Sequence, residues 1–350
     1  MPKGQQVVFF FKAKMLMKRM TVYFTPPSHT WIGTLTKALL CPFHTVFHGF
    51  DMENSALMRH VNKNSPSVLM RVFLFADSFS KQEDRRWHYA ISATNKAGIK
   101  NSIIILHKDV MNNKRLLRKM KRNNNILVAD MIDAMPSVDS LSYYSGVICC
   151  SHGALEYWER NFPKVPAYFI QHGVDPRIGT ITPSPEHFSP YYFGAPENLL
   201  LFEFLKPSLN IVYTDYSGVI NHDWHRRLSE ANFHYAVRPP VPEDSKYKYK
   251  PFTKGFTAAV CNSNILVHAS DGDALHYLGE DYPYLIKEDL CEEVVRRYMR
   301  QAKDDFGTER WHYGLQKMAQ LRELCNERVI VKQFGNMLQQ VEARDAFASP

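Results

Sequence analysis

The sequence contains no long apolar run. The first apolar stretch, residues 7–11, is too short for the hydrophobic core of a signal peptide, and no later stretch reaches the ~18 apolar residues of a membrane-spanning helix. Cysteine is also sparse. The six cysteines form no Cys-x-x-Cys pair, and several of them lie in apolar runs. We therefore expect no transmembrane helix and no disulfide framework, and we expect reduced thiols in a cytoplasmic protein.

Glycine motifs of known catalytic sites are missing as well. No two glycines stand one residue apart, which excludes the Gly-x-Gly of the dinucleotide-binding fingerprint. The sequence also has no Walker-type Gly-x-x-x-x-Gly-Lys and no Gly-x-Ser-x-Gly elbow. Dehydrogenases with that fingerprint, P-loop nucleotidases and α/β-hydrolases are therefore disfavoured.

Positive charge is in excess. The 350 residues carry a formal net charge of +8, which indicates an anionic partner: nucleic acid, phospholipid headgroups or a phosphorylated substrate. The basic run 114–125 (KRLLRKMKRNNN) has no aromatic residue on which bases could stack, so nucleic acid is the weaker interpretation. Four basic residues near the N-terminus either contact an anionic membrane surface or belong to a solvated leader: Lys12, Lys14, Lys18 and Arg19.

Short β-rich runs alternate with helical patterns in the first half of the chain. The expected strands are residues 21–24, 68–76, 102–107, 125–129, 146–150 and 167–171. The expected helices are residues 32–40, 54–61, 81–96, 113–122 and 153–161. This alternation is typical of parallel βαβ units, which bind ligands at the carboxyl ends of their strands.

A second series follows a proline-rich boundary. The expected strands there are residues 210–213, 233–238 and 264–269, and the expected helices are 222–231, 253–261 and 273–279. Residues 287–346 have an almost wholly helical pattern. The sequence therefore predicts two α/β domains followed by a helical tail.

One segment joins the two series. In residues 145–178 (SGVICCSHGALEYWERNFPKVPAYFIQHGVDPRI) an apolar strand ends at Ser151, and a second strand ends in a turn around Gly173. His172 and Asp175 flank that glycine, where the first domain ends. Polar residues in this position are either well placed to meet a ligand or form an ordinary turn with an aspartate cap.

This segment resembles the end of the N-terminal domain in GT-B-fold glycosyltransferases of the group 1 type. The second half continues the likeness in VYTDYSG (212–218), YAVRPP (235–240) and the stretch that leads to ASDGDALHYLG (269–279). The final helices, through LRELCNERVIVKQFGNMLQQV, resemble the tail that crosses back to the first domain. The Glu-x-seven-Glu pattern of retaining members is not present, so the stereochemistry stays open.

The resemblance implies an α/β fold of two Rossmann-like domains that face each other across a cleft, with a C-terminal helical tail. Residues 1–175 would form the acceptor-side domain, 176–208 a linker, 209–325 the nucleotide-sugar-binding domain and 326–350 a closing helix. The implied enzyme is a glycosyltransferase that moves a sugar from a nucleotide sugar to a hydroxyl of a carbohydrate or glycolipid, in polysaccharide, lipopolysaccharide or glycolipid synthesis. It would be cytoplasmic, with peripheral contact to the inner face of an anionic membrane. The alternatives are a basic nucleic-acid-binding protein and a catalytically inactive GT-B-like scaffold.

A donor diphosphate needs positive charge and fixed N–H donors. Arg238 ends a predicted strand before two prolines, and Lys250 and Lys254 follow in a lysine-rich stretch that could also be a solvated loop. Helix N-termini after two loops could add backbone N–H groups. The residues of these loops in the predicted donor site are Asp215, Ser217, Gly218, Ser270, Asp271, Gly272 and Asp273.

Asp271-Gly272-Asp273 has two interpretations. An Asp-x-Asp pair after a strand binds manganese in glycosyltransferases of the GT-A fold, but the same residues also explain an ordinary helix cap. We favour the cap, in which Asp271 or Asp273 faces sugar or ribose hydroxyls or turns back to its own helix. No cofactor is then expected, the nucleotide sugar being a substrate, and no divalent metal.

The resemblance implies a catalytic base on the first domain, because an acceptor hydroxyl must lose its proton as it attacks the donor. Asp77 follows a strongly apolar run and ranks first. Asp133 ranks second, although it could merely end a strand and cap a turn. His172 completes the set of candidate catalytic residues.

Overall fold

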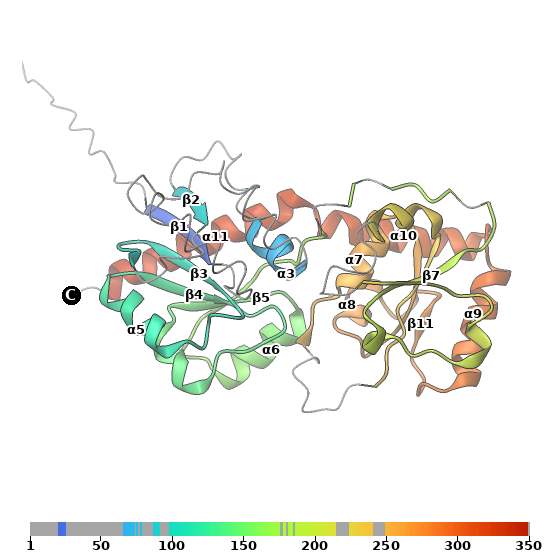
Figure 1. Ribbon diagram of the computed structural model, residues 1–350, viewed down its shortest axis with the longest axis horizontal. Helices are drawn as coiled ribbons and strands as arrows, with labels where there is room; N and C mark the ends of the chain where they lie inside the picture. The colour runs from blue at the N-terminus through green and yellow to red at the C-terminus, as the bar shows by residue number, and fades with distance from the viewer. Residues whose placement is uncertain are drawn as a thin grey trace, which may run out of the picture.

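The computed structural model describes residues 20–25, 66–73, 75, 78, 87–91, 98–175, 178–179, 181–184, 186–214, 224–240 and 249–348. These residues form two lobes, each built around a parallel β-sheet (Figure 1). Among them, no helix has the length and apolar character needed to cross a membrane.

The first sheet has six parallel strands in the order β2-β1-β3-β4-β5-β6. All residues of β3, β4 and β5 are buried, as expected for central strands of a parallel sheet with both faces covered. The strands are β1 (Met20–Thr25), β2 (Trp87–Ile91), β3 (Ile103–His107), β4 (Ile126–Asp130), β5 (Gly146–Cys149) and β6 (Ala167–Phe169).

Helices cover both faces of the first sheet. On one face, α5 (Lys114–Arg122), α6 (His152–Asn161) and the 3₁₀-helix η4 (Val138–Tyr143) share a core cluster with alternate strand residues. On the other face, α3 (Pro66–Val68), η2 (Leu69–Phe73) and α11 (Glu327–Ala348) form a second cluster. In Figure 1, α5 and α6 lie below the strands and α11 lies above them.

The second sheet has five parallel strands in the order β11-β10-β9-β7-β8. The strands are β7 (Pro190–Gly194), β8 (Asn210–Tyr213), β9 (Phe233–Tyr235), β10 (Asn264–His268) and β11 (Leu285–Ile286). The helices of this lobe are α7 (Thr253–Val260), α8 (Ala274–Leu278), α9 (Glu292–Asp304) and α10 (Glu309–Leu324), with short 3₁₀ turns η5 (Pro196–Asn198), η6 (Glu203–Leu205) and η7 (Trp224–Glu230).

Both sheets begin with the same strand order. Numbered within its own domain, each sheet runs 2-1-3-4-5, and the first adds a sixth strand. The order reverses between β1 and β3 in the first domain and between β7 and β9 in the second. Parallel sheets bind ligands outside the carboxyl ends of the strands at such a reversal.

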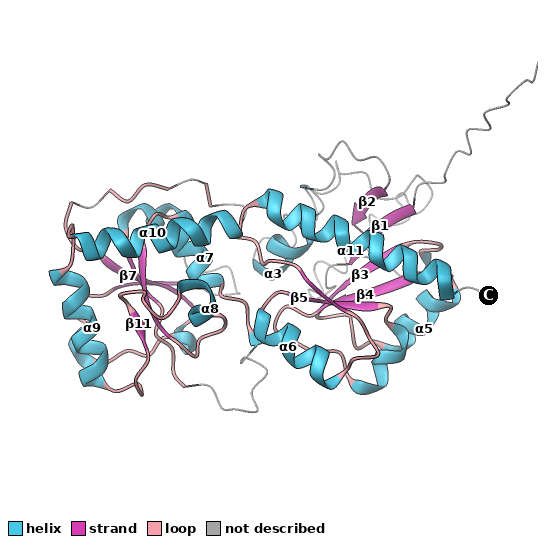
Figure 2. Cartoon of the chain, turned by 180° about the vertical axis from the view of Figure 1, so that it is seen from behind, coloured by secondary structure: helices cyan, strands magenta, loops and turns pink. Residues whose placement is uncertain are grey.

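The predicted fold class is confirmed: the chain has two Rossmann-like domains and a C-terminal helix that returns to the first. Figure 2 shows α10 lying across the second lobe and α11 continuing over the first. Buried α11 residues, among them Phe334 and Leu338, join the cluster that contains Val22 and Ile105 of the first sheet.

Two predictions in the first domain were wrong. Residues 68–76 were expected to be a strand, but residues 66–73 are helical, since Val68, Val72 and Phe75 recur at helical spacing and share one core cluster. Residues 81–96 were expected to be a helix, but β2 lies within them, and Trp87 and Tyr89 alternate into that same cluster. The helices expected at 32–40 and 54–61 lie outside the described residues.

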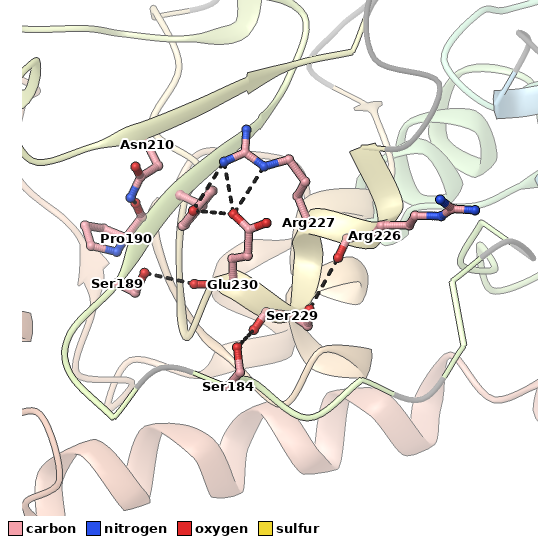
Figure 3. A network of polar contacts seen from close by, with 9 residues as sticks. Ser184, Ser189, Pro190, Asn210, Arg226, Arg227, Ser229 and Glu230 are labelled. Carbon is pink, nitrogen blue, oxygen red and sulfur yellow. Dashed lines mark hydrogen bonds and ion pairs between the residues drawn. The ribbon is translucent and has the colours of Figure 1, made fainter.

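Residues 176–208 were expected to form a linker, yet β7 lies in this segment and pairs with both β8 and β9. The prolines around β7 suggested a loop, but Pro190 begins the strand, a position that proline tolerates. Figure 3 shows how polar contacts fix the approach to this strand: Ser184 Oγ donates to the Ser229 carbonyl (3.0 Å) and Ser189 Oγ to the Glu230 carbonyl (2.8 Å).

A buried ion pair joins η2 to the end of β4. The Arg71 Nε and Nη2 atoms donate to the two carboxylate oxygens of Asp130 at 2.9 and 2.8 Å, and Nη1 donates to the carbonyls of Ile170 and Gln171 at 3.4 and 3.3 Å. Both charged side chains are buried. The pair therefore connects three elements at the carboxyl edge of the first sheet.

We predict that Asp130→Ala lowers the free energy of unfolding by about 3–5 kcal/mol, because it leaves the buried Arg71 charge uncompensated. Urea unfolding followed by fluorescence measures this loss. Asp139→Ala is the matched control, since its ion pair with Lys114 is exposed to solvent, which screens the two charges, and its loss should have little effect. Equal stabilities of the two variants would contradict the structural role assigned to the buried pair.

Candidate functional site

Cationic side chains gather at the strand reversal of the second sheet. Lys254 on α7 extends over the ring of Tyr192 on β7, with Nζ 4.1 Å from the ring centroid, and its Nζ lies 3.5 Å from the Asn198 carbonyl in η5. Arg238 follows β9, the strand on the other side of the reversal. The predicted residues Arg238 and Lys254 are therefore brought to the position where a parallel sheet binds its ligand.

Burial and like charge act on Lys254. Loss of solvent and, to a smaller extent, the nearby Arg238 lower the pKa of its ammonium group to about 7, while Asp271 opposes the change. A lysine with a pKa near 7 gains its proton readily when an anion arrives. The position is thus suited to an anionic group rather than to a neutral one.

Asp271 is the counter-charge of this cluster. Its Oδ2 lies 3.0 Å from Arg238 Nε, but the two atoms are not aligned as a hydrogen bond, and neither has a hydrogen-bond partner among the described residues. Burial raises the pKa of the Asp271 carboxyl, and Arg238, Lys254 and Lys250 partly offset the rise. Arg238 is therefore neutralised only in part and retains a donor for a ligand.

Lys250 extends the cluster toward the first domain. Its Nζ is 4.0 Å from Asp133 Oδ2, and Lys108 Nζ donates to the other carboxylate oxygen of Asp133 at 2.5 Å. Burial lowers the pKa of Lys250, and Asp133 opposes that change. Asp133, a predicted catalytic residue, thus lies beside the donor-side cations although it belongs to the first domain.

Asp273 does not cap its own helix. It occupies the residue position before α8 without a side-chain bond to that helix. Its carboxylate instead accepts the backbone N–H groups of His152 at 2.6 Å and Gly153 at 3.2 Å, in the first turn of α6 in the other domain. Of the orientations expected for Asp271 or Asp273, the turn-back to α8 is therefore not the one that Asp273 adopts, because the first turn of α6 presents two N–H groups to its carboxylate.

His172 is buried at the end of the first sheet. Its Nδ1 donates to the Gly173 carbonyl at 2.7 Å. Burial lowers the pKa of the imidazole to about 4, and Arg71 contributes to the lowering. The ring is neutral near pH 7 and has almost no exposed surface, so it supports the turn rather than facing a substrate.

The remaining predicted residues divide into two groups. Ser270 is exposed, and its Oγ lies 2.6 Å from His268 Nδ1. Gly272 has a φ of 55°, a left-handed conformation that favours glycine. Four predicted site residues lie outside the described residues: Asp77, Asp215, Ser217 and Gly218.

Sequence reasoning missed the contacts between the domains. The His152 ring lies between Phe169 and His276, with centroid distances of 4.2 and 3.9 Å, and the Tyr277 hydroxyl donates to Gln171 Oε1 at 3.0 Å. The sequence shows polar residues after the ends of strands. It does not indicate which residues of the other domain they contact. Among the described residues, no group of three or more His, Cys, Asp or Glu side chains is placed to hold a metal ion.

No protein-family model and no curated protein matches this sequence. Solved structures do match. HepE of Anabaena in complex with UDP and glucose has a TM-score of 0.53 and 10% identity, over 92% of this chain and 100% of that chain. The complex of HepE with UDP gives a TM-score of 0.51 at the same identity and coverage.

The chain spans little more than half the length of two other matched structures. It covers 57% of a chain of the GtfA/B complex and 55% of TarM of S. aureus, with TM-scores of 0.46 and 0.47, each at 10% identity and over 69% and 67% of this chain. The full-length likeness to HepE shows that this chain has the GT-B fold.

We predict that Gly272→Ala destabilises the protein by at least about 1–2 kcal/mol, the cost of a left-handed conformation for a residue with a Cβ. The new Cβ would also lie 2.8 Å from the Lys250 carbonyl oxygen. Thermal unfolding measures the change. Gly335→Ala on α11 is the control, since nothing lies within 4 Å of its Cβ position and alanine favours a helix. An unchanged melting temperature for Gly272→Ala would refute this account of the turn.

Proposed function

We propose that the protein is a glycosyltransferase that moves a sugar from a nucleotide-sugar donor to a hydroxyl acceptor. The observation that carries the proposal is the cluster of Arg238, Lys250 and Lys254 at the strand reversal of a GT-B second domain. A donor diphosphate would bring negative charge to this group of three cations. HepE, whose fold this chain shares, was solved with UDP and with UDP and glucose, which supports a nucleotide sugar as the donor.

Arg238 and Lys254 would hold the diphosphate by charge-assisted hydrogen bonds. Lys254 is proton-deficient near neutral pH, so donor binding would draw a proton onto it. Asp271 carries negative charge beside these groups and would repel a bare diphosphate, so it would face sugar or ribose hydroxyls. Predicted donor contacts at Asp215, Ser217 and Gly218 complete the proposed site.

Asp133 is the proposed catalytic base among the described residues, with Asp77 as the other candidate. The base must lie on the acceptor side and within reach of a hydroxyl that attacks the donor sugar. Asp133 meets the first requirement, and its contact with Lys250 brings it to the donor side. Lys108 and Lys250 hold the carboxylate from two directions, which orients it for that proton transfer.

The proposed reaction uses no divalent metal. Coordination of one ion by both carboxylates of Asp-x-Asp requires the two side chains to face the same point. Here Asp271 faces Arg238, whereas Asp273 binds two backbone N–H groups of α6. The two carboxylates have separate partners, which favours neutralisation of the diphosphate by protein cations.

We also propose a cytoplasmic location with peripheral contact to an anionic membrane, and an acceptor from polysaccharide, lipopolysaccharide or glycolipid synthesis. Five cysteines among the described residues are free and four of them are buried, which suits a reducing compartment. The exposed cations of α5 would supply the membrane contact, since none of them pairs with a described carboxylate: Arg115, Arg118, Lys119 and Arg122.

Replacing Arg238 or Lys254 with alanine should weaken UDP binding by ~1.5–3 kcal/mol, the range for hydrogen bonds to charged groups. Isothermal titration calorimetry with UDP and GDP measures the affinity, with and without EDTA. Lys303→Ala, an exposed lysine at the end of α9, is the control and should bind as the wild type does. UDP and GDP that fail to bind, together with salt-dependent binding of DNA, would overturn the proposal in favour of a nucleic-acid-binding protein.

Affinity for UDP should fall as the pH rises above 7. Lys254 has a pKa of about 7 in the free protein, and the diphosphate favours its protonated form, so binding takes up a proton. Uptake of one proton limits the change in UDP affinity to about tenfold per pH unit. Lys254→Met should remove this dependence, and it also controls for the titration of UDP itself. Parallel pH profiles of the two proteins would contradict the role of Lys254.

A further inference from the structure

The first turn of α6 is completed by the other domain. Three backbone N–H groups at its start have acceptors: Asp273 takes those of His152 and Gly153, and Ser151 Oγ takes that of Ala154 at 3.1 Å. The Ser151 hydroxyl itself donates to the Tyr249 carbonyl of the second domain at 2.8 Å. The positive end of the α6 dipole therefore faces a carboxylate that belongs to the second domain.

Two further contacts surround this cap. The rings of His152 and His276 lie 3.9 Å apart, one from each domain, and Phe169 lies on the other side of His152. Tyr277, the next residue on α8, donates its hydroxyl to Gln171, whose backbone N–H donates to Gln333 of α11. The second-domain partners Asp273, His276 and Tyr277 come from one short segment, residues 273–277, and they contact residues just beyond β5 and β6 of the first sheet.

We propose that Asp273 is a positioning residue that holds the first domain closed against the donor site. It does so by capping α6, and the His152–His276 pair makes the closed form sensitive to acid. Asp271 and Asp273 flank the left-handed Gly272, so the turn that carries the counter-charge of Arg238 also carries the cap of α6. The significance for sugar transfer rests on the proposed function, but the closure itself is a property of the free protein.

The sign of the acid effect follows from the surroundings of His152. His276 and Asp273 face the ring from α8 and Glu156 faces it from α6, while β6 contributes the uncharged Phe169. Burial and His276 lower the pKa of His152 in the closed form, against the opposing effect of the two carboxylates. The closed form thus binds fewer protons than an open form with a solvated His152, and acid below about pH 6.5 favours opening.

The test measures the distance between the domains in the free protein. Spin labels on cysteines introduced at the exposed positions Arg118 of α5 and Lys303 of α9, in a background that carries Cys41→Ser and Cys291→Ser, report it by pulsed electron resonance. Asp273→Ala should add a longer-distance population and shift the closed-to-open ratio by roughly tenfold or more, because hydrogen bonds to a carboxylate are among the stronger ones. Asp273→Asn keeps one acceptor oxygen and should lie between Asp273→Ala and the wild type.

Asp281→Asn is the matched control. Asp281 also accepts two bonds, from Tyr313 and Lys317, but both donors belong to its own domain, so its distances should equal those of the wild type. The wild type should open between pH 7.5 and 5.5, and His276→Gln should reduce that response. Identical distance distributions for Asp273→Ala and the wild type, both folded by circular dichroism, would overturn the proposal.

Binding of UDP separates this inference from the proposed function. Asp273→Ala retains Arg238 and Lys254, so its affinity for UDP should change less than that of Arg238→Ala. A wild type that does not bind UDP would sink the proposed function, yet the label distances would still decide whether Asp273 closes the domains. Wild-type UDP binding with no Asp273 effect on distance would sink only the closure.

Discussion

The contact of one turn with two domains is the constraint on which the candidate site depends. Asp271 and Asp273 stand on either side of Gly272, whose left-handed conformation sends the two carboxylates to different partners. One carboxylate balances Arg238 beside the donor-side lysine, and the other completes the α6 helix of the first domain. Because Asp271 and Asp273 are only two positions apart in the chain, a movement of the donor-side cations and a movement between the domains cannot be independent.

The electrostatics of the second domain follow from this arrangement. Arg238, Lys250 and Lys254 lie together, with Asp271 and the more distant Asp133 as counter-charges in the described part of the chain, and burial lowers the pKa of both lysines. Like charges removed from water are unfavourable unless an anion offsets them. The three cations therefore outnumber the described carboxylates beside them, and the proposed diphosphate would offset this excess at the site as a whole rather than at one residue.

Sequence reasoning found the elements whose pattern is local. The buried runs of β3, β4 and β5 and the residue types after β9 placed Arg238 and Lys254 near the ligand edge without structural information. It failed where contacts distant in the sequence decide: Val68, Val72 and Phe75 pack in one cluster with α11 and the first sheet, and β7 pairs with a strand on each side. The partner of Asp273 lies 121 residues away in the sequence, and no local pattern contains that information.

The difference between local pattern and distant contacts also explains why Asp271-Gly272-Asp273 is ambiguous in the sequence but not in the structure. Asp-x-Asp, a helix cap and an interdomain cap all require a carboxylate beside a tight turn, so the residue types alone do not separate them. The separating quantity is the direction of each carboxylate, and that depends on Gly272 and on the free N–H groups of α6. A carboxylate that already accepts two backbone N–H groups would have to give them up to coordinate a cation, and the first turn of α6 would then lose its partner. Closure of the domains and metal binding at this turn are therefore competing uses of Asp273, and the contacts of α6 favour closure.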